Sequence, residues 1–124
     1  MKTAPKTAGE WFATPLGEYL LVRELAYFDR TVSDIFGYNA LQLGMMEHDL
    51  LRASRIPMRC QIDAGGAAQL RADFHDLPIA SNSTDLVVLP HVLEFSQHPH
   101  QILREVARVL LPEAHVVISG FNPR

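Results

Sequence analysis

Two aspartates and one glycine are the residues best placed to bind a polar ligand, because each follows or ends a stretch that is a candidate β-strand. Gly44 follows the run ALQL, Asp63 ends the run MRCQID and Asp73 ends the run AQLRAD. A glycine lets the backbone approach a ligand closely, and a carboxylate accepts hydrogen bonds from hydroxyl or amino groups. Open α/β sheets bind ligands at the carboxyl ends of their strands, so these three positions predict a binding site there.

Each of the polar candidates also has a purely structural interpretation. Asp73 is equally suited to capping the turn that begins FHDLP, and Asp63 precedes the sequence AGG, where aspartate commonly forms a turn. His91 and Glu94 are one helical turn apart, which suits either a metal pair or a capping or core contact. No Ser-His-Asp or Cys-His arrangement is indicated, so the sequence identifies no catalytic residue.

Length, composition and charge exclude several classes of protein. The chain has 124 residues, about one domain, and 48% of them are hydrophobic, which is enough for a substantial core. The formal net charge is -3 and basic runs are absent, so a nucleic-acid partner is not expected. No apolar stretch approaches the roughly 20 residues that span a bilayer, so a membrane partner is not expected either. The single cysteine, Cys60, cannot form an internal disulfide, and we expect a cytoplasmic protein.

The pattern of apolar residues predicts a flexible leader at 1–13 and a partial α/β domain at 14–124. Thr14 and Pro15 are typical of the start of a helix, because they combine an N-cap with a proline at the first helical position. Apolar residues then recur every three or four positions, which predicts a long helix over 15–36.

A second helix is expected to begin at Pro99 and to stop at Pro112. Its apolar positions should face the core and its charged positions should face water; these are Leu103, Val106 and Leu110, and Arg104, Glu105 and Arg108, respectively. Strands are expected over five short stretches, at 40–44, 58–63, 68–73, 84–90 and 114–119.

The second and third of these strands lie too close in sequence for an ordinary parallel connection. Only a few residues separate them, whereas a parallel crossover takes roughly a dozen or more. We therefore expect a β-hairpin at 58–73 around Gly65 and Gly66. After residue 70, the alternation of strand and helix predicts a right-handed parallel α/β unit.

The segment from Ala72 to Pro123 resembles the class I S-adenosylmethionine-dependent methyltransferases, and within them the type 11 branch. In that branch an aspartate precedes Leu-Pro-Phe, and Asp-Leu-Val, His-x-Leu-Glu and Arg-Glu-x-x-Arg-Val-Leu-x-Pro follow. This chain carries the elements in the same order: Asp73, LPI at 77–79, DLV at 85–87, HVLE at 91–94 and REVARVLLP at 104–112. Each element alone is common, but their order is specific for the fold and the family.

The resemblance implies a truncated Rossmann-like methyltransferase sheet with a long N-terminal helix, and S-adenosylmethionine as the cofactor. It implies that Asp63 holds the ribose hydroxyls and that Asp73 contacts the adenine amino group. The type 11 proteins have the pair that matches His91 and Glu94 without a metal, so no metal is expected here. The cofactor-binding residues that the resemblance implies are Gly44, Asp63, Asp73, Phe74, Leu89 and His91.

One part of the family pattern is missing, in the loop after the first expected strand. The family has Asp-x-Gly-x-Gly-x-Gly at this place, whereas the sequence here reads QLGMMEH, from Gln42 to His48. An amide replaces the acid, and Met46 and His48 replace two glycines whose positive φ and close approach to a ligand do not suit bulky residues. We therefore expect the binding of S-adenosylmethionine to be weak or absent.

Two functions follow from these observations. The first is an S-adenosylmethionine-dependent methyltransferase acting on a small-molecule acceptor, which the sequence does not identify. The second is a catalytically inactive domain of the same fold that serves as an interaction or scaffold module. A nicotinamide-dependent oxidoreductase is not expected, because GMMEHD lacks the Gly-x-Gly-x-x-Gly pattern.

The last expected strand, at 114–119, should be an exposed edge of the sheet. Two further strands follow the corresponding strand in the family, whereas this sequence ends at Arg124. An unpaired apolar edge promotes association, so we expect a homodimer or a larger assembly.

Overall fold

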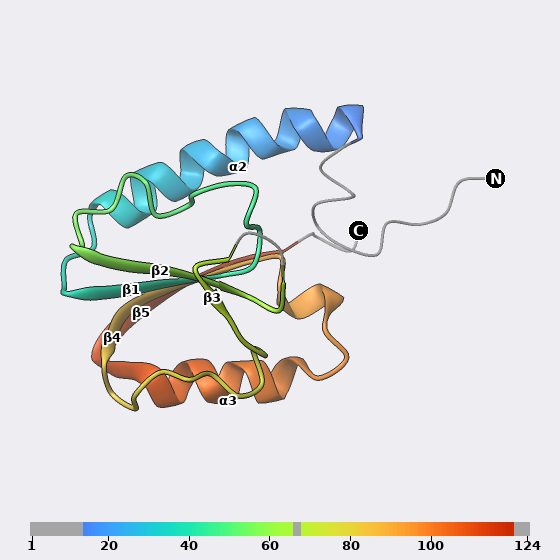
Figure 1. The fold of residues 1–124 in the computed structure, drawn as a ribbon. Coiled ribbons are helices and arrows are strands. Elements are labelled where there is room, and N and C mark those ends of the chain that lie inside the picture. The colour runs from blue at the N-terminus through green and yellow to red at the C-terminus, as the bar shows by residue number, and fades with distance from the viewer. Residues whose placement is uncertain (1–13, 66–67, 121–124) are drawn as a thin grey trace.

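The fold is one parallel β-sheet with a helix on each of its two faces (Figure 1). The computed structural model describes residues 14–65 and 68–120. The sheet has the order β3-β2-β1-β4-β5, and all of its pairings are parallel. In chain order the elements are α2 (Pro15–Ser33), β1 (Asn39–Leu43), β2 (Met58–Asp63), β3 (Leu70–Arg71), β4 (Thr84–Pro90), the 3-10 helix η1 (Leu93–Phe95), α3 (Pro99–Val109) and β5 (Leu110–Ser119).

Helix α2 begins where the sequence predicts and ends slightly earlier. The Thr14 hydroxyl accepts a hydrogen bond from the backbone N–H of Gly17 at 3.1 Å, which caps the first turn. The helix ends at Ser33 rather than at residue 36, because the N–H of Ile35 donates back to the Val32 carbonyl (3.2 Å) in a tighter turn. Val32 and Ile35 are buried against the sheet, as their spacing predicts.

Two apolar clusters hold the helices against the sheet, and strand β4 contributes to both. Leu86 and Val88 belong to the cluster beneath α2, and Val87 and Leu89 belong to the cluster beneath α3. Successive side chains of a strand point to opposite faces, so a central strand that is covered on both sides must be apolar throughout. This explains the unbroken apolar sequence of β4.

Helix α3 turns a different set of side chains toward the sheet than the sequence predicts. Ile102, Val106 and Val109 are buried, whereas Leu103 is 36% exposed. Both sets have helical spacing, so the apolar pattern alone does not distinguish the two rotations of the helix. Pro112 does not stop the helix, because α3 ends at Val109 and Pro112 lies inside β5.

The expected β-hairpin at 58–73 is wrong. Strands β2 and β3 pair in parallel, with Ile62 opposite Leu70. The short connection suffices because β3 has two residues and pairs only with the end of β2, so the chain does not travel back along a full strand. The Gln69 side chain supports this path by accepting a hydrogen bond from the backbone N–H of Gln61 at 2.9 Å.

Strand β5 is an edge of the described sheet, as the sequence predicts for 114–119, but it is longer than expected. It pairs only with β4, and its apolar side chains Val116 and Ile118 are 42% and 46% exposed. Since β3 at the other edge has two residues, β5 provides the longer unpaired edge.

Two sequence expectations concern parts of the chain outside the described residues, namely the leader at 1–13 and the turn residue Gly66. Within the part that the structure describes, no helix is both long enough and apolar enough to cross a membrane.

Candidate functional site

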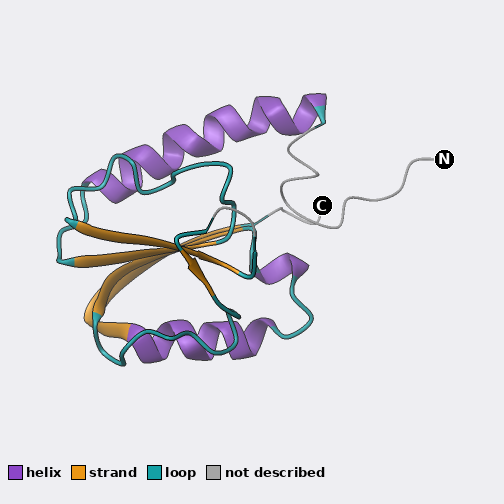
Figure 2. Cartoon of the chain, in the orientation of Figure 1, coloured by secondary structure: helices purple, strands orange, loops and turns teal. Residues whose placement is uncertain are grey.

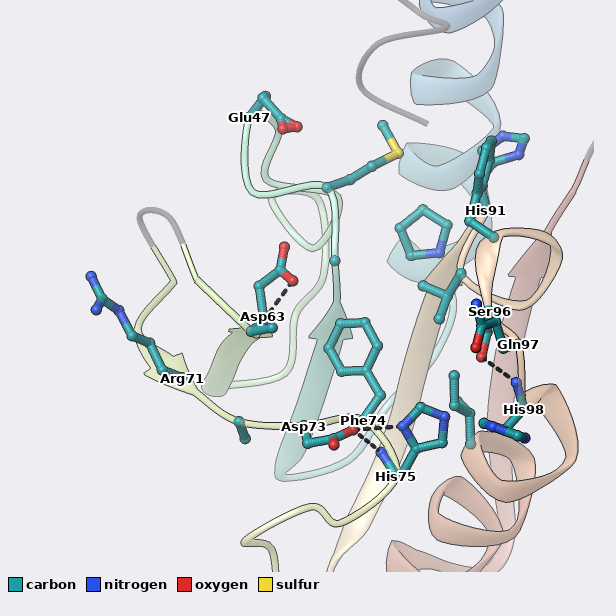
Figure 3. Close-up of a pocket in the computed structure, with 18 residues that line it drawn as sticks. Glu47, Asp63, Arg71, Asp73, Phe74, His75, His91, Ser96, Gln97 and His98 are labelled. Atoms are coloured by element: carbon teal, nitrogen blue, oxygen red, sulfur yellow. Dashed lines mark hydrogen bonds and ion pairs between the residues drawn. The ribbon is translucent and has the colours of Figure 1, made fainter. Parts of the chain in front are cut away.

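Loops and the short helix η1 gather at the carboxyl ends of the strands (Figure 2). Residues of these segments surround a cavity of about 1040 Å³ (Figure 3). Strands β1 and β4 are neighbours here although the chain passes through β2 and β3 between them, so the strand order reverses at this point. Open α/β sheets bind their ligands at such a reversal. The cavity is lined by Gly44, Met45, Glu47, Asp63, Ala64, Arg71, Ala72, Asp73, Phe74, His75, Pro90, His91, Val92, Phe95, Ser96, Gln97, His98 and Ile102.

The structure brings together five of the six residues that the family resemblance implies for the cofactor. Leu89 is the exception, because its side chain is fully buried in the cluster beneath α3. Side chains alternate between the two faces of β4, and Leu89 points into the apolar cluster beneath α3. Pro90 and His91, at the end of the strand, reach the cavity. The five that line the cavity are Gly44, Asp63, Asp73, Phe74 and His91.

Gln42 has a role that its sequence position does not reveal. Its side chain is fully buried, and its Oε1 accepts a hydrogen bond from the backbone N–H of Leu50 at 2.9 Å. Its Nε2 carries two hydrogens, which are shared among three carbonyl oxygens of the following loop, those of Gly44 (2.9 Å), Met45 (3.1 Å) and His48 (2.9 Å). One amide therefore closes the loop at 44–50 upon itself.

The polar atoms of Gln42 are directed into this loop and not into the cavity. Gln61 adds a further hydrogen bond, from its Nε2 to Gln42 Oε1 at 3.3 Å, and Gln42 is absent from the cavity lining. A carboxylate at position 42 would have no donor for the three carbonyl oxygens that face it. The amide therefore suits this loop in a way that the acid of the family pattern would not.

The loop after β1 keeps a left-handed backbone at two consecutive positions. Gly44 has a φ of 89° and Met45 has a φ of 54°. A Cβ atom at Gly44 would lie 3.4 Å from Val92 Cγ2 and 3.8 Å from Phe74 Cζ. The missing side chain therefore leaves space between the loop and these two residues, which suits a backbone that approaches a ligand.

The loop presents Met45 and Glu47 to the cavity, rather than Met46 and His48 as the sequence suggests. The turn closed by the N–H of His48 on the Met45 carbonyl (3.1 Å) changes which side chains face inward. Glu47 is exposed and forms no hydrogen bond or ion pair with any residue that the structure describes. Sequence reasoning missed Glu47 because the family spacing does not define the path of this loop.

Asp63 both forms a turn and lines the cavity, so its two sequence interpretations are compatible. Its Oδ1 accepts a hydrogen bond from the backbone N–H of Ala64 at 2.7 Å. The side chain lies at the end of β2, on the cavity wall beside Arg71 (Figure 3).

Asp73 also combines both of its predicted roles. Its Oδ1 accepts from the backbone N–H of His75 at 2.8 Å and lies 2.6 Å from His75 Nδ1, so it caps the turn that begins there. These contacts, the backbone one first, hold the pKa of Asp73 below its usual value, and the carboxylate is charged at neutral pH. The side chain remains 68% exposed at the cavity.

His91 is the most buried polar residue of the lining, at 3% exposure. Its Nε2 lies 2.8 Å from Glu24 Oε2 of α2, and its Nδ1 lies 3.1 Å from Glu94 Oε2 of η1. Burial opposes the charged ring, but the two carboxylates together outweigh it and raise the pKa of His91. The ring therefore joins helix α2 to the wall of the cavity. This link spans 67 positions and could not be predicted from local sequence patterns.

The arrangement around His91 matches the core-contact interpretation, in which the imidazole is held by acidic neighbours. Among the residues that the structure describes, no group of three histidine, cysteine or acidic side chains is arranged to hold a metal ion.

Two charged residues of α3 hold a loop beside the site, although the sequence places them toward water. Glu105 Oε2 accepts from the backbone N–H of Leu77 at 2.7 Å, and Arg108 donates to the carbonyl oxygens of Leu77 (2.8 Å) and Ile79 (2.9 Å). Glu105 and Arg108 are also paired with each other at 2.8 Å. This clamp fixes the chain just after the turn at Asp73.

The aspartate of the DLV motif also has a structural role. Asp85 Oδ2 accepts from the backbone N–H groups of Tyr38 (2.8 Å) and Asn39 (3.1 Å), at the start of β1. A Cβ atom at Gly37 would collide with the Asp85 side chain, so glycine permits this close approach.

Comparison with known proteins agrees with this architecture. The family described as "Methyltransferase domain", type 11, matches residues 25–118. The chain is 35% identical over 91 residues to the Uncharacterized protein YafS of Escherichia coli (strain K12), an alignment that covers 72% of this chain and 38% of that protein. The chain thus spans less than half the length of this relative.

Two solved structures share the fold. The Haloferax volcanii complex between the Trm112 methyltransferase activator and a methyltransferase matches with a TM-score of 0.68 and 20% identity, over 94% of this chain and 61% of that one. A SAM dependent methyltransferase from Aquifex aeolicus matches with a TM-score of 0.66 and 16% identity, over 94% of this chain and 72% of that one. At these identities the likeness establishes the fold alone.

Proposed function

The chain belongs to the methyltransferase domain family, type 11, and from this premise we propose that it acts in S-adenosylmethionine-dependent methyl transfer. The observation that carries the proposal is the cavity at the carboxyl edge, where Gly44, Asp63 and Asp73 lie together. Its volume of about 1040 Å³ is slightly above the usual range for small-molecule sites, roughly 300–1,000 Å³. A nucleoside cofactor and a small acceptor can share such a space.

The residues present suit the adenosine half of the cofactor. We assign the ribose hydroxyls to Asp63 and the adenine amino group to Asp73, because a carboxylate accepts from both kinds of donor. The ring of Phe74 lies in the same lining and offers an apolar face for the base. The space beside Gly44 allows backbone to approach the cofactor.

Methyl transfer makes modest demands on the protein's own chemistry. When bound, S-adenosylmethionine supplies a methyl group that is already activated by the sulfonium, so the protein mainly orients the acceptor. His91 is unsuited to act as a base toward an acceptor, because both ring nitrogens face the carboxylates of Glu24 and Glu94. We propose a small-molecule acceptor that fills the remainder of the cavity.

We further propose that the cofactor binds more weakly here than the family pattern would allow. The buried Gln42 amide offers no charge to the ammonium group of the cofactor. A hydrogen bond to a charged group contributes roughly 1.5–3 kcal/mol, which corresponds to about one to two orders of magnitude in affinity. The methionine half of the cofactor should therefore add less to the affinity here than it would with the family's acid at position 42.

The alternative proposal is a catalytically inactive domain that binds a partner through the same fold. The observation that favours it is the loop at 44–50, which Gln42 closes by hydrogen bonds within the protein. In this case the cavity would hold a nucleoside at most, and the methionine half of the cofactor would add nothing to binding.

A calorimetric titration decides between these proposals. Wild type and Asp73→Ala are titrated with S-adenosylmethionine, its demethylated product and adenosine. Asp76→Ala serves as the matched control, because Asp76 is a nearby exposed acid that does not line the cavity. The enzyme proposal expects saturable binding of S-adenosylmethionine that weakens about tenfold or more in Asp73→Ala, and an unchanged control.

Three other outcomes are informative. A low-micromolar dissociation constant for S-adenosylmethionine, lost in Asp73→Ala, would contradict the weak-binding proposal and support an enzyme with full cofactor affinity. Binding of adenosine without any gain from the methionine half would support the inactive domain. No saturable binding of any of the three ligands would refute the assignment of the cavity.

A further inference from the structure

We infer that Glu47 is the residue that binds the ammonium group of the cofactor's methionine half, an inference that rests on the proposed binding of S-adenosylmethionine. It would take over the contact that the family pattern gives to the acid at position 42. Glu47 is on the cavity wall, and neither the family pattern nor the spacing of the glycine loop assigns it a role.

The first step of the argument is that Gln42 is not available to a ligand. Its side chain is fully buried, and its two polar atoms already bind the backbone of 44–50 and the side chain of Gln61. To contact a ligand, the amide would have to release several hydrogen bonds in the interior, each of which is costly to leave unmade. The charge that balances an ammonium must therefore come from another residue.

The second step is that the same hydrogen bonds hold Glu47 in place. The carbonyl oxygens of Met45 and His48, on either side of it, are both bound by Gln42. The backbone is thereby fixed before and after Glu47, while its side chain extends from the loop at the opposite end of the lining from Asp73 and His75 (Figure 3). A rigid backbone reduces the entropy that is lost when the side chain engages a ligand.

The third step is charge complementarity. The lining contains three carboxylates, those of Glu47, Asp63 and Asp73. Asp63 and Asp73 are assigned to the adenosine half, and both already accept hydrogen bonds from neighbouring backbone. Glu47 is the remaining acid of the lining and has no hydrogen-bonding or ionic partner among the described residues. A cofactor with an ammonium group and a sulfonium supplies the missing positive charge.

The experiment compares two ligands, only one of which carries the ammonium group that Glu47 is proposed to bind. S-adenosylmethionine carries the ammonium, whereas 5′-methylthioadenosine has the same nucleoside and sulfur but no amino-acid portion. Each ligand is titrated into wild type, Glu47→Gln, Glu47→Lys and the control Asp49→Asn. Asp49 is on the same loop but outside the lining, and an asparagine there can still accept the hydrogen bond from Leu51 N.

We expect Glu47→Gln to weaken S-adenosylmethionine binding about two- to fivefold, since an exposed ion pair is screened by water. Glu47→Lys, which reverses the charge, should weaken it about tenfold or more. Binding of 5′-methylthioadenosine should be unchanged in both variants, and Asp49→Asn should bind both ligands like wild type.

The outcomes that contradict the inference are distinct from failure of the proposed function. Equal losses for both ligands would place Glu47 on the nucleoside, and no loss in Glu47→Lys would remove it from the site; either result overturns the inference while the proposed function stands. If neither ligand binds wild type, the proposed function fails, and the role of Glu47 fails with it.

Discussion

Two loops that begin at the carboxyl edge of the sheet are held in place by different means. The loop after β3 is clamped from outside, because Glu105 and Arg108 of α3 bind the backbone of 77–79. The loop after β1 is closed from inside, because the buried amide of Gln42 binds the backbone of 44–50. In both cases a side chain satisfies backbone groups that the strands leave unpaired.

The difference separates the part of the family pattern that holds the fold from the part that contacts a ligand. Glu105, Arg108 and Asp85 match the family and all three bind backbone of the protein itself. Position 42 departs from the family, and its new side chain has become a structural element of the loop. A match to the family at Glu105, Arg108 and Asp85 therefore identifies the fold. It does not by itself establish that position 42 contacts a ligand.

The largest expected effect concerns the inner support of the loop after β1. Gln42→Leu keeps a similar size but leaves the carbonyl oxygens of Gly44 and His48 and the N–H of Leu50 without this partner. The Met45 carbonyl keeps the N–H of His48. Each unsatisfied buried group costs about 1–3 kcal/mol, so the free energy of unfolding should fall by at least about 3 kcal/mol. Urea denaturation measures this change, and a variant as stable as wild type would show that the amide does not support the loop.

A second variant places the family's acid at position 42 and tests whether it can replace the amide. Gln42→Glu keeps the acceptor for Leu50 N but removes both donors and brings negative charge against the three carbonyl oxygens. We expect it to destabilise the fold and to give no gain in affinity for S-adenosylmethionine, by urea denaturation and titration. Tighter binding in a stable variant would show that the family's acid can still function at this position.

The outer clamp should give the next largest effect. Arg108→Gln removes the donors to the Leu77 and Ile79 carbonyl oxygens, and Tm should fall by several degrees. Arg104→Gln is the matched control, because Arg104 is an exposed arginine on the same helix with no partner among the described residues. Equal Tm values for the two variants in a thermal melt would show that Arg108 is only a surface charge.

The link between α2 and the cavity wall should make stability depend on pH. The pKa of His91 is raised in the folded state above its usual value of 6.5, so the folded protein binds the His91 proton more tightly than the unfolded chain does. This contribution is complete below about pH 6.5 and is lost as the pH rises through the folded pKa. Urea denaturation between pH 6 and 9 should show a falling free energy of unfolding, and His91→Gln should flatten that slope; a slope of equal size in the variant would assign it to another group.

The smallest effect is expected at the edge strand. The prediction of a homodimer rests on the unpaired length of β5 and on the exposure of Val116 and Ile118. Ile118→Lys, with a charge on the edge, should shift any association toward the monomer. Light scattering over a range of concentrations measures this, and a wild-type monomer at the highest concentration would contradict the prediction.

The positions of most elements could be predicted from the sequence because they depend on local patterns. The Thr14 cap and the unbroken apolar run of β4 both reflect interactions within or beside one element. The rotation of α3 could not be predicted, since Leu103 and Ile102 both fit a helical apolar stripe with Val106. The parallel pairing of β3 was missed because the rule on crossover length assumes strands of ordinary length.

The site was predictable only where a residue's place follows from the end of a strand. Gly44, Asp63 and Asp73 were located in this way. The structural role of Gln42 could not be predicted because its partners are mostly backbone atoms, whose positions depend on the path of a loop. Glu24 was missed because its contact with His91 joins segments that are distant in the sequence.

The central claim, that the cavity at the carboxyl edge is the site for S-adenosylmethionine, is tested most directly by mapping the bound ligand onto the backbone. A titration followed by ¹H–¹⁵N NMR reports on every amide and tolerates the weak affinity proposed here. The account predicts saturable shift changes concentrated at the carboxyl edge, with Tyr38 and Met58 at the amino ends of β1 and β2 unchanged. Changes centred on Tyr38 and Met58, or none with millimolar ligand, would contradict it. The amides expected to shift are those of Gly44, Glu47, Ala64, Phe74 and His91.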